Sequence, residues 1–67
     1  MLNYELTIEE IIDAFEPYME GEEFEDFKEG WERELTHPLE SVNYHARLRD
    51  FAASDDRFYD VFRLIEI

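Results

Sequence analysis

The side chains best suited to catalysis in this sequence are one serine and two histidines. Ser41 and His45 stand four residues apart and could touch on a helix, but the sequence offers no third group to orient the histidine as a base. His37 and His45 are eight residues apart and lack the H-E-x-x-H spacing of a helical zinc site. We therefore expect no nucleophilic site, no metal site and no cofactor.

Carboxylates are far more numerous, but none stands out as half of an acid–base pair. A carboxyl group with a raised pKa needs an apolar pocket, which a short chain can hardly build. Asp55, Asp56 and Asp60 lack the spacing and the glycine of a calcium loop. Gly21 and Gly30 are the only glycines, so a glycine-rich phosphate loop is excluded as well. The sequence predicts a protein that is not an enzyme.

The overall charge narrows the choice of partner. The 67 residues include 19 Asp and Glu against six Lys and Arg, for a formal net charge of −13. Such a chain is repelled by nucleic acids and anionic membranes. It contains no cysteine, no apolar run of membrane-spanning length and no signal-peptide pattern at its start. We expect a soluble protein of the cytoplasm, which could be that of a phage-infected host cell. We expect it to make no direct contact with nucleic acid or membrane.

The negative charge is concentrated in the first part of the chain. Residues 1–40 hold 14 acids and two bases, whereas residues 41–67 hold five acids and four bases. The first part is thus strongly acidic and the second part nearly neutral. A charge run is usually a solvated face, and that interpretation stays open. A halophilic origin would acidify the whole surface, so the segregation argues against it and favours an acidic surface with a function.

The acids of the first part fall into two rows at helical spacing. One row is Glu9, Asp13, Glu16 and Glu20; the other is Glu22, Asp26, Glu29 and Glu32, flanked by Glu23 and Glu25. Neighbours in such rows lie about 5–6 Å apart, and like charges there destabilise a helix by about 0.2–0.5 kcal/mol per pair. Two such rows on packed helices would imitate two phosphate backbones that border a groove. We interpret the cost in stability as a sign that the electric field is useful.

The elements that must position these acids are helices. The pattern predicts one mainly α domain over residues 1–67, with three to four short helices. Thr7 and Glu10 form a capping box that begins the first helix. Pro17 ends this helix one or two residues earlier, and Gly21 is the predicted stop. The acidic row from Glu9 is expected to persist only as far as this helix does.

The second helix is predicted over Glu22–Leu35. Its apolar stripe consists of Phe24, Phe27, Trp31 and Leu35. Gly30 is unfavourable inside a helix and is predicted to mark a close approach by another backbone beside Trp31. Trp31 is most simply a core residue, and the alternative is an anchor that binds a partner.

The remaining elements are a third helix over Pro38–Ala53 and a final segment over Arg57–Ile67. The final segment has apolar residues at helical spacing, so we favour a helix. Its β-branched composition also allows a strand. In that alternative, residues 2–6 pair with residues 60–67 and the fold becomes α+β.

These features predict a small protein inhibitor that mimics nucleic acid. Its partner would be a basic nucleic-acid-binding protein such as a CRISPR effector, a restriction enzyme or another nuclease. In size and charge pattern the chain resembles phage counter-defence proteins of the anti-CRISPR and anti-restriction kind. The predicted partner-binding residues are Glu9, Asp13, Glu16, Glu20, Glu22, Glu23, Glu25, Asp26, Glu29, Glu32 and Trp31.

Two other functions fit parts of the same pattern. An antitoxin or immunity protein that neutralises a basic toxin would use the same electrostatics. An interaction adaptor would make contact through its aromatic residues, and the charge would only keep it soluble. A chain of this length has a core that supplies only a few kcal/mol, so a homodimer is a further possibility for added stability.

Overall fold

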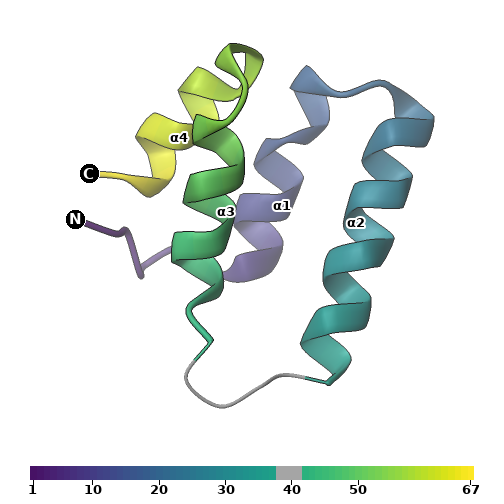
Figure 1. Cartoon of the computed structure of the whole chain (residues 1–67), viewed down its shortest axis with the longest axis horizontal. Coiled ribbons are helices and arrows are strands. Elements are labelled where there is room, and N and C mark those ends of the chain that lie inside the picture. Colours follow the sequence, from purple (N-terminus) through teal and green to yellow (C-terminus); the bar gives the residue numbers. More distant parts are fainter. Residues whose placement is uncertain (38–41) are drawn as a thin grey trace.

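Four α-helices of alternating direction make up most of residues 1–37 and 42–67, the parts of the chain that the computed structural model describes (Figure 1). They are α1 (Ile8–Ala14), α2 (Gly21–Thr36), α3 (Tyr44–Ala53) and α4 (Tyr59–Ile65), with 3₁₀ turns η1 (Glu16–Tyr18) and η2 (Asp56–Phe58). The prediction of a mainly α fold with three to four short helices is confirmed. No helix among the described residues is long and apolar enough to cross a membrane.

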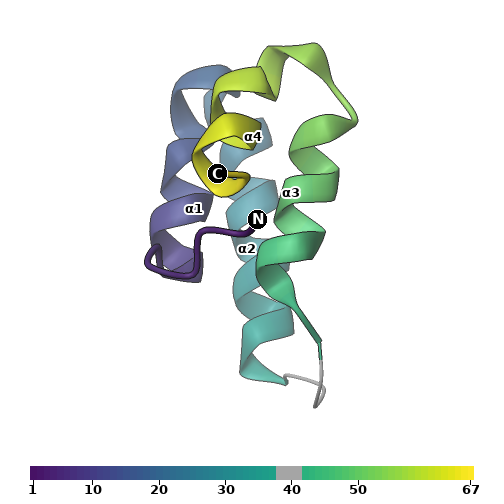
Figure 2. The same cartoon turned by 90° about the vertical axis from the view of Figure 1, so that its left-hand side faces the viewer.

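The helices α2 and α4 lie on opposite sides of a central pair formed by α1 and α3. Figures 1 and 2, which differ by a quarter turn, agree on this order. The acidic helix α2 therefore forms one outer wall of the molecule. Helix α4, from the nearly neutral part of the chain, forms the opposite wall.

The first helix begins and ends for the reasons that the sequence indicates. The Glu10 backbone N–H donates to the Thr7 hydroxyl (3.1 Å), and the Thr7 N–H donates to the Glu10 carboxylate (3.0 Å). This is the predicted capping box. The α-helix ends at Ala14 because Pro17 lacks an N–H and fits only the start of a new turn. The predicted first row of acids is thereby interrupted after Asp13.

Two predictions about the glycines are wrong. Gly21 does not stop the first segment; it is the first residue of α2, and its φ is not the left-handed value that ends a helix. Gly30 is not approached by any backbone of the described chain, since a Cβ placed there would meet nothing within 4 Å. Its cost of about 1 kcal/mol relative to alanine therefore has no explanation in the packing of the described residues.

The third helix is shorter than predicted. It begins at Tyr44, because the Asn43 side chain caps it by accepting the Ala46 N–H (3.1 Å). The predicted start of this helix at Pro38 and the possible contact of Ser41 with His45 depend on residues 38–41, which lie outside the described residues. The end at Ala53 is as predicted.

The final segment is helical, as favoured, and the two-strand alternative is wrong. Residues 2–6 and 60–67 form no strand, but one antiparallel bridge joins Leu2 to Glu66. The Asn3 N–H donates to the Ile65 carbonyl (2.8 Å), and the Ile67 N–H donates to the Met1 carbonyl (2.8 Å). The two segments are thus neighbours, as the alternative supposed, but their contact is only one bridge long.

The core is built mainly from α1, α3 and α4. Its buried members are Ile11, Ile12, Phe15, Phe24, Leu48, Ala52, Phe58, Val61 and Ile65. Only Phe24 comes from α2, whose other apolar side chains are half-buried. Aromatic rings fill the space between α2 and the core: the Phe27 centroid lies 4.8 Å from that of Phe15 and 5.1 Å from that of Phe51. Helix α2 is therefore a peripheral element that keeps most of its circumference exposed.

Candidate functional site

The outer acidic face is the side of α2 that points away from the core. With 3.6 residues per turn, the stripe of Phe24, Phe27 and Trp31 turns the opposite side of the helix to solvent. That side carries four exposed carboxylates, which we call the outer acidic face: Glu22, Glu25, Asp26 and Glu29. Among the described residues, only Glu29 has a cationic partner there, Arg33 at 2.9 Å. Most of this charge is left without compensation.

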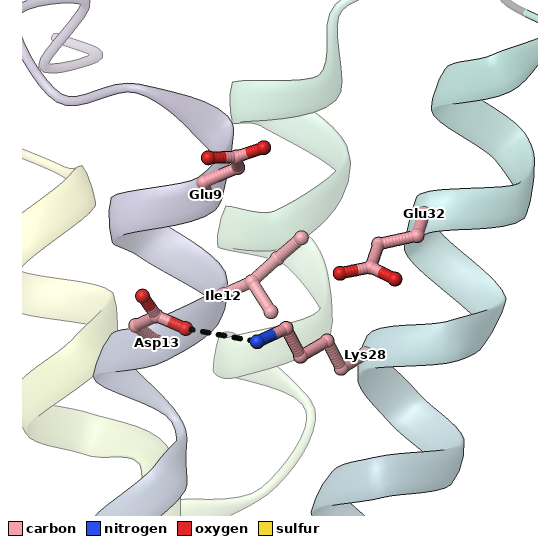
Figure 3. A pocket seen from close by; sticks show the side chains of 5 residues that line it. All are labelled: Glu9, Ile12, Asp13, Lys28 and Glu32. Atoms are coloured by element: carbon pink, nitrogen blue, oxygen red, sulfur yellow. Dashed lines mark ion pairs between the residues drawn. The ribbon is translucent and has the colours of Figure 1, made fainter.

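A second group of acids faces a cleft between α1 and α2. The cleft is lined by Glu9, Ile12 and Asp13 from α1 and by Lys28 and Glu32 from α2. Lys28 points toward Asp13, and Glu9 lies on the other side of Ile12 (Figure 3). The cleft has a volume of about 140 Å³. The Lys28 Nζ lies 3.9 Å from Asp13 Oδ1, a loose contact between exposed side chains. Lys28 is the one cation among the residues that line the cleft, against three carboxylates, so the α1–α2 cleft remains negative.

The outer acidic face and the α1–α2 cleft form one continuous surface. Around the circumference of α2, the side chains of Glu25 and Glu32 lie between the outermost residues of the helix and the flank that faces α1. Glu9 and Asp13 continue the surface on the far side of the cleft. Of the predicted first row, only Glu9 and Asp13 lie on α1, and they share the cleft with Glu32 of α2.

The opposite flank of α2 is different, because its carboxylates are bound by arginines. The Arg57 guanidinium donates two hydrogen bonds to Glu23, of 2.9 and 2.8 Å, and Arg47 is ion-paired with Glu34. We call these two contacts the arginine bridges. They fasten α2 to η2 and to α3. Hydrogen bonds from Arg57 and Arg47 lower the pKa values of the Glu23 and Glu34 carboxyls.

Acids in the nearly neutral part of the chain also have close partners. Arg49 bonds Asp50 (3.2 Å) and Glu66 (3.1 Å), Arg57 bonds Asp55 (3.2 Å), and the Tyr18 hydroxyl donates to Asp60 (3.1 Å). The bond to Asp60 raises the pKa of Tyr18. The N-terminal ammonium and Arg49 lower the pKa of Glu66. Among the described residues, uncompensated negative charge is therefore concentrated in residues 1–37, which include α2 and the α1–α2 cleft.

The predicted site residues separate into five groups. The outer acidic face holds Glu22, Glu25, Asp26 and Glu29, and the α1–α2 cleft holds Glu9, Asp13 and Glu32. Glu16 belongs to η1 and Glu20 is the N-cap of α2, so the predicted first row is split after Asp13. Glu23 is held in an arginine bridge. Trp31 is half-buried, with its ring centroid 6.0 Å from that of Tyr44.

Sequence reasoning missed the arginine bridges and Glu34. The bridges join residues 13 and 34 positions apart, and helical periodicity carries no information on such pairs. A partial signal was available, because both arginines stand near aromatic residues. The guanidinium carbon of Arg57 lies 4.5 Å from the Phe58 ring centroid, and that of Arg47 lies 4.9 Å from the Trp31 centroid.

The arginine bridges predict how stability depends on pH. Because the folded protein holds the Glu23 and Glu34 protons less tightly than the unfolded chain, the bridges stabilise the fold fully above about pH 4.5. That contribution is lost as the pH falls through the lowered pKa values. The double variant Glu23→Gln/Glu34→Gln should melt below the wild type at about pH 7, and the difference should shrink as the pH falls below about 4.5 and through the lowered pKa values.

Thermal unfolding followed by circular dichroism measures both quantities. The matched control is Glu22→Gln/Glu25→Gln, which removes two carboxylates of the same helix that have no cationic partner among the described residues. This control should melt at or above the wild-type temperature at about pH 7, because it removes like-charge repulsion. Equal destabilisation by both double variants would contradict a specific role for the bridges.

The histidines and the other candidate chemical groups form no recognisable centre in the described parts of the chain. No group of three or more His, Asp or Glu is arranged there to hold a metal ion. The His45 Nε2 lies 2.8 Å from the Leu6 carbonyl, so it donates a hydrogen bond that ties α3 to the N-terminal segment.

Comparison of the chain with models of protein families, with curated proteins and with solved structures gave no significant match.

Proposed function

We propose that this protein is an inhibitor that mimics nucleic acid and blocks the basic groove of a nucleic-acid-binding protein. The observation that carries the proposal is the distribution of uncompensated charge. Among the described residues, nearly all carboxylates without a bound cation, tyrosine or ammonium lie in the acidic part of the chain, residues 1–37. Those on the outer acidic face or in the α1–α2 cleft are Glu9, Glu22, Glu25, Asp26 and Glu32. The others in this part are Glu5, Glu10, Glu16 and Glu20. In residues 42–67, by contrast, every acid except Asp56 is bound by arginine, tyrosine or the N-terminal ammonium. The segregation supports a surface built for a cationic partner.

The spacing of the charges supports the same proposal. Carboxylates three or four residues apart on α2 rise by about 4.5–6 Å along the helix axis. The phosphates of one DNA strand follow one another at about 3.4 Å of axial rise. The outer acidic face thus presents a line of charges on a scale similar to a nucleic-acid backbone. The acids of α1 supply a second, shorter line across the cleft (Figure 3).

In the proposed mechanism, the carboxylates occupy the lysines and arginines that the target uses to hold phosphates. Charge-assisted hydrogen bonds between carboxylate and guanidinium are the strong interactions in such a contact. The field of the acidic wall also steers the target into the encounter, which makes association fast and sensitive to salt. Bound in this way, the protein excludes nucleic acid by occupying its place.

The experiment that tests the proposal is an affinity capture from a lysate of the source cell. The immobilised protein is washed with rising salt, then with duplex DNA or with RNA, and released proteins are identified by mass spectrometry. We expect one basic nucleic-acid-binding protein that is released both by moderate salt and by nucleic acid. Its nucleic-acid binding should be inhibited by stoichiometric amounts of the inhibitor.

Other outcomes would assign a different function. A captured toxin whose neutralisation leaves unrelated DNA-binding proteins unaffected would indicate an antitoxin or immunity protein. A partner that resists high salt, binds no nucleic acid and is lost with Trp31→Ala would indicate an adaptor that binds through aromatic residues. Association only with a second copy of the chain would indicate a homodimer. Each of these results contradicts the proposal of a nucleic-acid mimic.

A further inference from the structure

The flank of α2 that faces η2 and α3 binds arginine twice. Glu23 near one end of this flank is bound by Arg57, and Glu34 near the other end is bound by Arg47. In each case the guanidinium also lies against an aromatic ring, with carbon-to-centroid distances of 4.5 Å to Phe58 and 4.9 Å to Trp31. A carboxylate of α2 together with an aromatic ring is therefore the environment in which this surface holds a guanidinium.

Beside the Glu34–Arg47 bridge, the same flank of α2 carries another carboxylate next to aromatic rings, Asp26, to which no arginine of the described chain is bound. A shallow hollow of about 320 Å³ is lined by Asp26, Phe27, Gly30, Trp31, Glu34 and Arg47. We call it the Gly30 hollow. Asp26 is exposed and has no ion-pair partner among the described residues. Arg47 is already engaged by Glu34, so the chain's own arginine covers only one side.

Gly30 keeps the hollow open at a cost to the helix. It lies in the interior of α2, where alanine is preferred over glycine. A Cβ at this position would meet nothing within 4 Å, so no contact in the described chain requires a glycine. A methyl group there would instead project into the hollow that Gly30 lines. The presence of glycine at position 30 is thus explained if a group from outside the chain lies against the backbone of α2.

We infer that the Gly30 hollow receives an arginine side chain of the basic partner. This inference rests on the proposed function, because it takes the partner to be a basic protein. The aliphatic stem of the arginine would cross Gly30 beside Trp31, and its guanidinium would meet Asp26. Arginine fits better than lysine, because its planar and weakly hydrated head stacks on aromatic rings and binds carboxylates through two hydrogen bonds.

The test uses a nona-arginine peptide as the probe and Trp31, the only tryptophan, as the reporter. The peptide is titrated into the protein at low and at moderate salt, and both affinity and Trp31 emission are recorded. For the wild type we expect a saturable change in emission, and a smaller one with nona-lysine. Gly30→Ala should abolish the emission change. It should also weaken nona-arginine binding about fivefold, because this factor corresponds to the loss of one cation–π contact and one exposed ion pair.

The matched control is Gly21→Ala. Gly21 also lies in α2 with nothing within 4 Å of an added Cβ, but it does not line the hollow. Gly21→Ala should bind the peptide and change Trp31 emission as the wild type does. Gly30→Ala should at the same time raise the melting temperature by about 4–8 °C, which shows that lost binding is not lost folding. A third variant, Asp26→Asn, should also weaken binding.

Two results would overturn the inference, and they separate it from the proposed function. If Gly30→Ala binds nona-arginine like the wild type with the same emission change, the Gly30 hollow is not the arginine site. The proposed function would survive that result, provided that Glu22→Gln/Glu25→Gln/Glu29→Gln still reduces peptide binding. If that triple variant binds the peptide as tightly as the wild type, the acidic surface itself is not a binding site and both proposals fail.

Discussion

Neutralising the outer acidic face is expected to weaken binding to the target by about a hundredfold while the fold is preserved. The variant carries Glu22→Gln, Glu25→Gln, Asp26→Asn and Glu29→Gln, all at exposed positions of α2. Close charge pairs across an interface are coupled strongly enough that the loss of four of them accounts for this factor. The association rate should fall as well, because steering depends on the same charges. Binding kinetics on the captured target measure both effects.

The stability of this variant should change in the opposite direction. Glu22 and Asp26, and likewise Glu25 and Glu29, are like-charged pairs one helical turn apart, and their repulsion destabilises α2. The variant should therefore melt at or above the wild-type temperature. A surface whose acids weaken the fold but strengthen binding is typical of a functional site. A binding loss that came with unfolding would not support the proposal.

The control for this prediction removes four acids from other places. Glu5→Gln, Asp50→Asn, Asp56→Asn and Asp60→Asn change the net charge by the same amount but leave the outer acidic face and the α1–α2 cleft intact. Binding should fall by less than about threefold, the effect of a weaker overall field. If both quadruple variants lose binding equally, the total charge matters and the arrangement of the acids does not.

Replacing Phe15 by alanine is expected to unfold the protein at room temperature. Phe15 is fully buried, and its ring centroid lies 4.8–5.6 Å from those of Phe27, Phe51 and Phe58. It thus connects α2, α3 and η2 to α1. Removing such a ring costs about 3–5 kcal/mol, and a chain of this size has only about 3–5 kcal/mol to lose.

Circular dichroism and thermal unfolding test this expectation. At about 25 °C, Phe15→Ala should show a reduced helical signal, and heating should produce no cooperative transition. Tyr59→Ala is the matched control, since Tyr59 is also aromatic but 58% exposed. It should cost less than about 1 kcal/mol. A cooperative transition in Phe15→Ala close to that of the wild type would show that the aromatic cluster does not hold the fold together.

Local signals in the sequence were sufficient to place most helix boundaries. The capping box of Thr7 and Glu10, the break before Pro17 and the apolar stripe of α2 all act between residues a few positions apart. The start of α3 was misplaced because the N-cap preference of Asn43 was not weighed. Asparagine at that position, three residues before the Ala46 N–H that it binds, was a readable signal.

The candidate site depended on contacts between distant residues, which periodicity does not report. The acids on α2 were identified from the sequence, but their separation into an outer face, a cleft and two arginine bridges follows from how α1 and α3 pack against α2. Arg57 and Arg47 remove Glu23 and Glu34 from the available surface. Glu9, Asp13, Lys28 and Glu32 line one cleft, although together they span 24 residues of sequence.

Competition for the captured target tests the mimicry most directly. A labelled duplex DNA or RNA that the target binds is titrated in the presence of rising concentrations of the protein, and the bound fraction is followed by fluorescence anisotropy. Mimicry predicts mutually exclusive binding, so the apparent Kd of the nucleic acid should rise in proportion to the protein concentration without a plateau. A ternary complex of target, nucleic acid and protein, seen as a plateau in this titration, would contradict it.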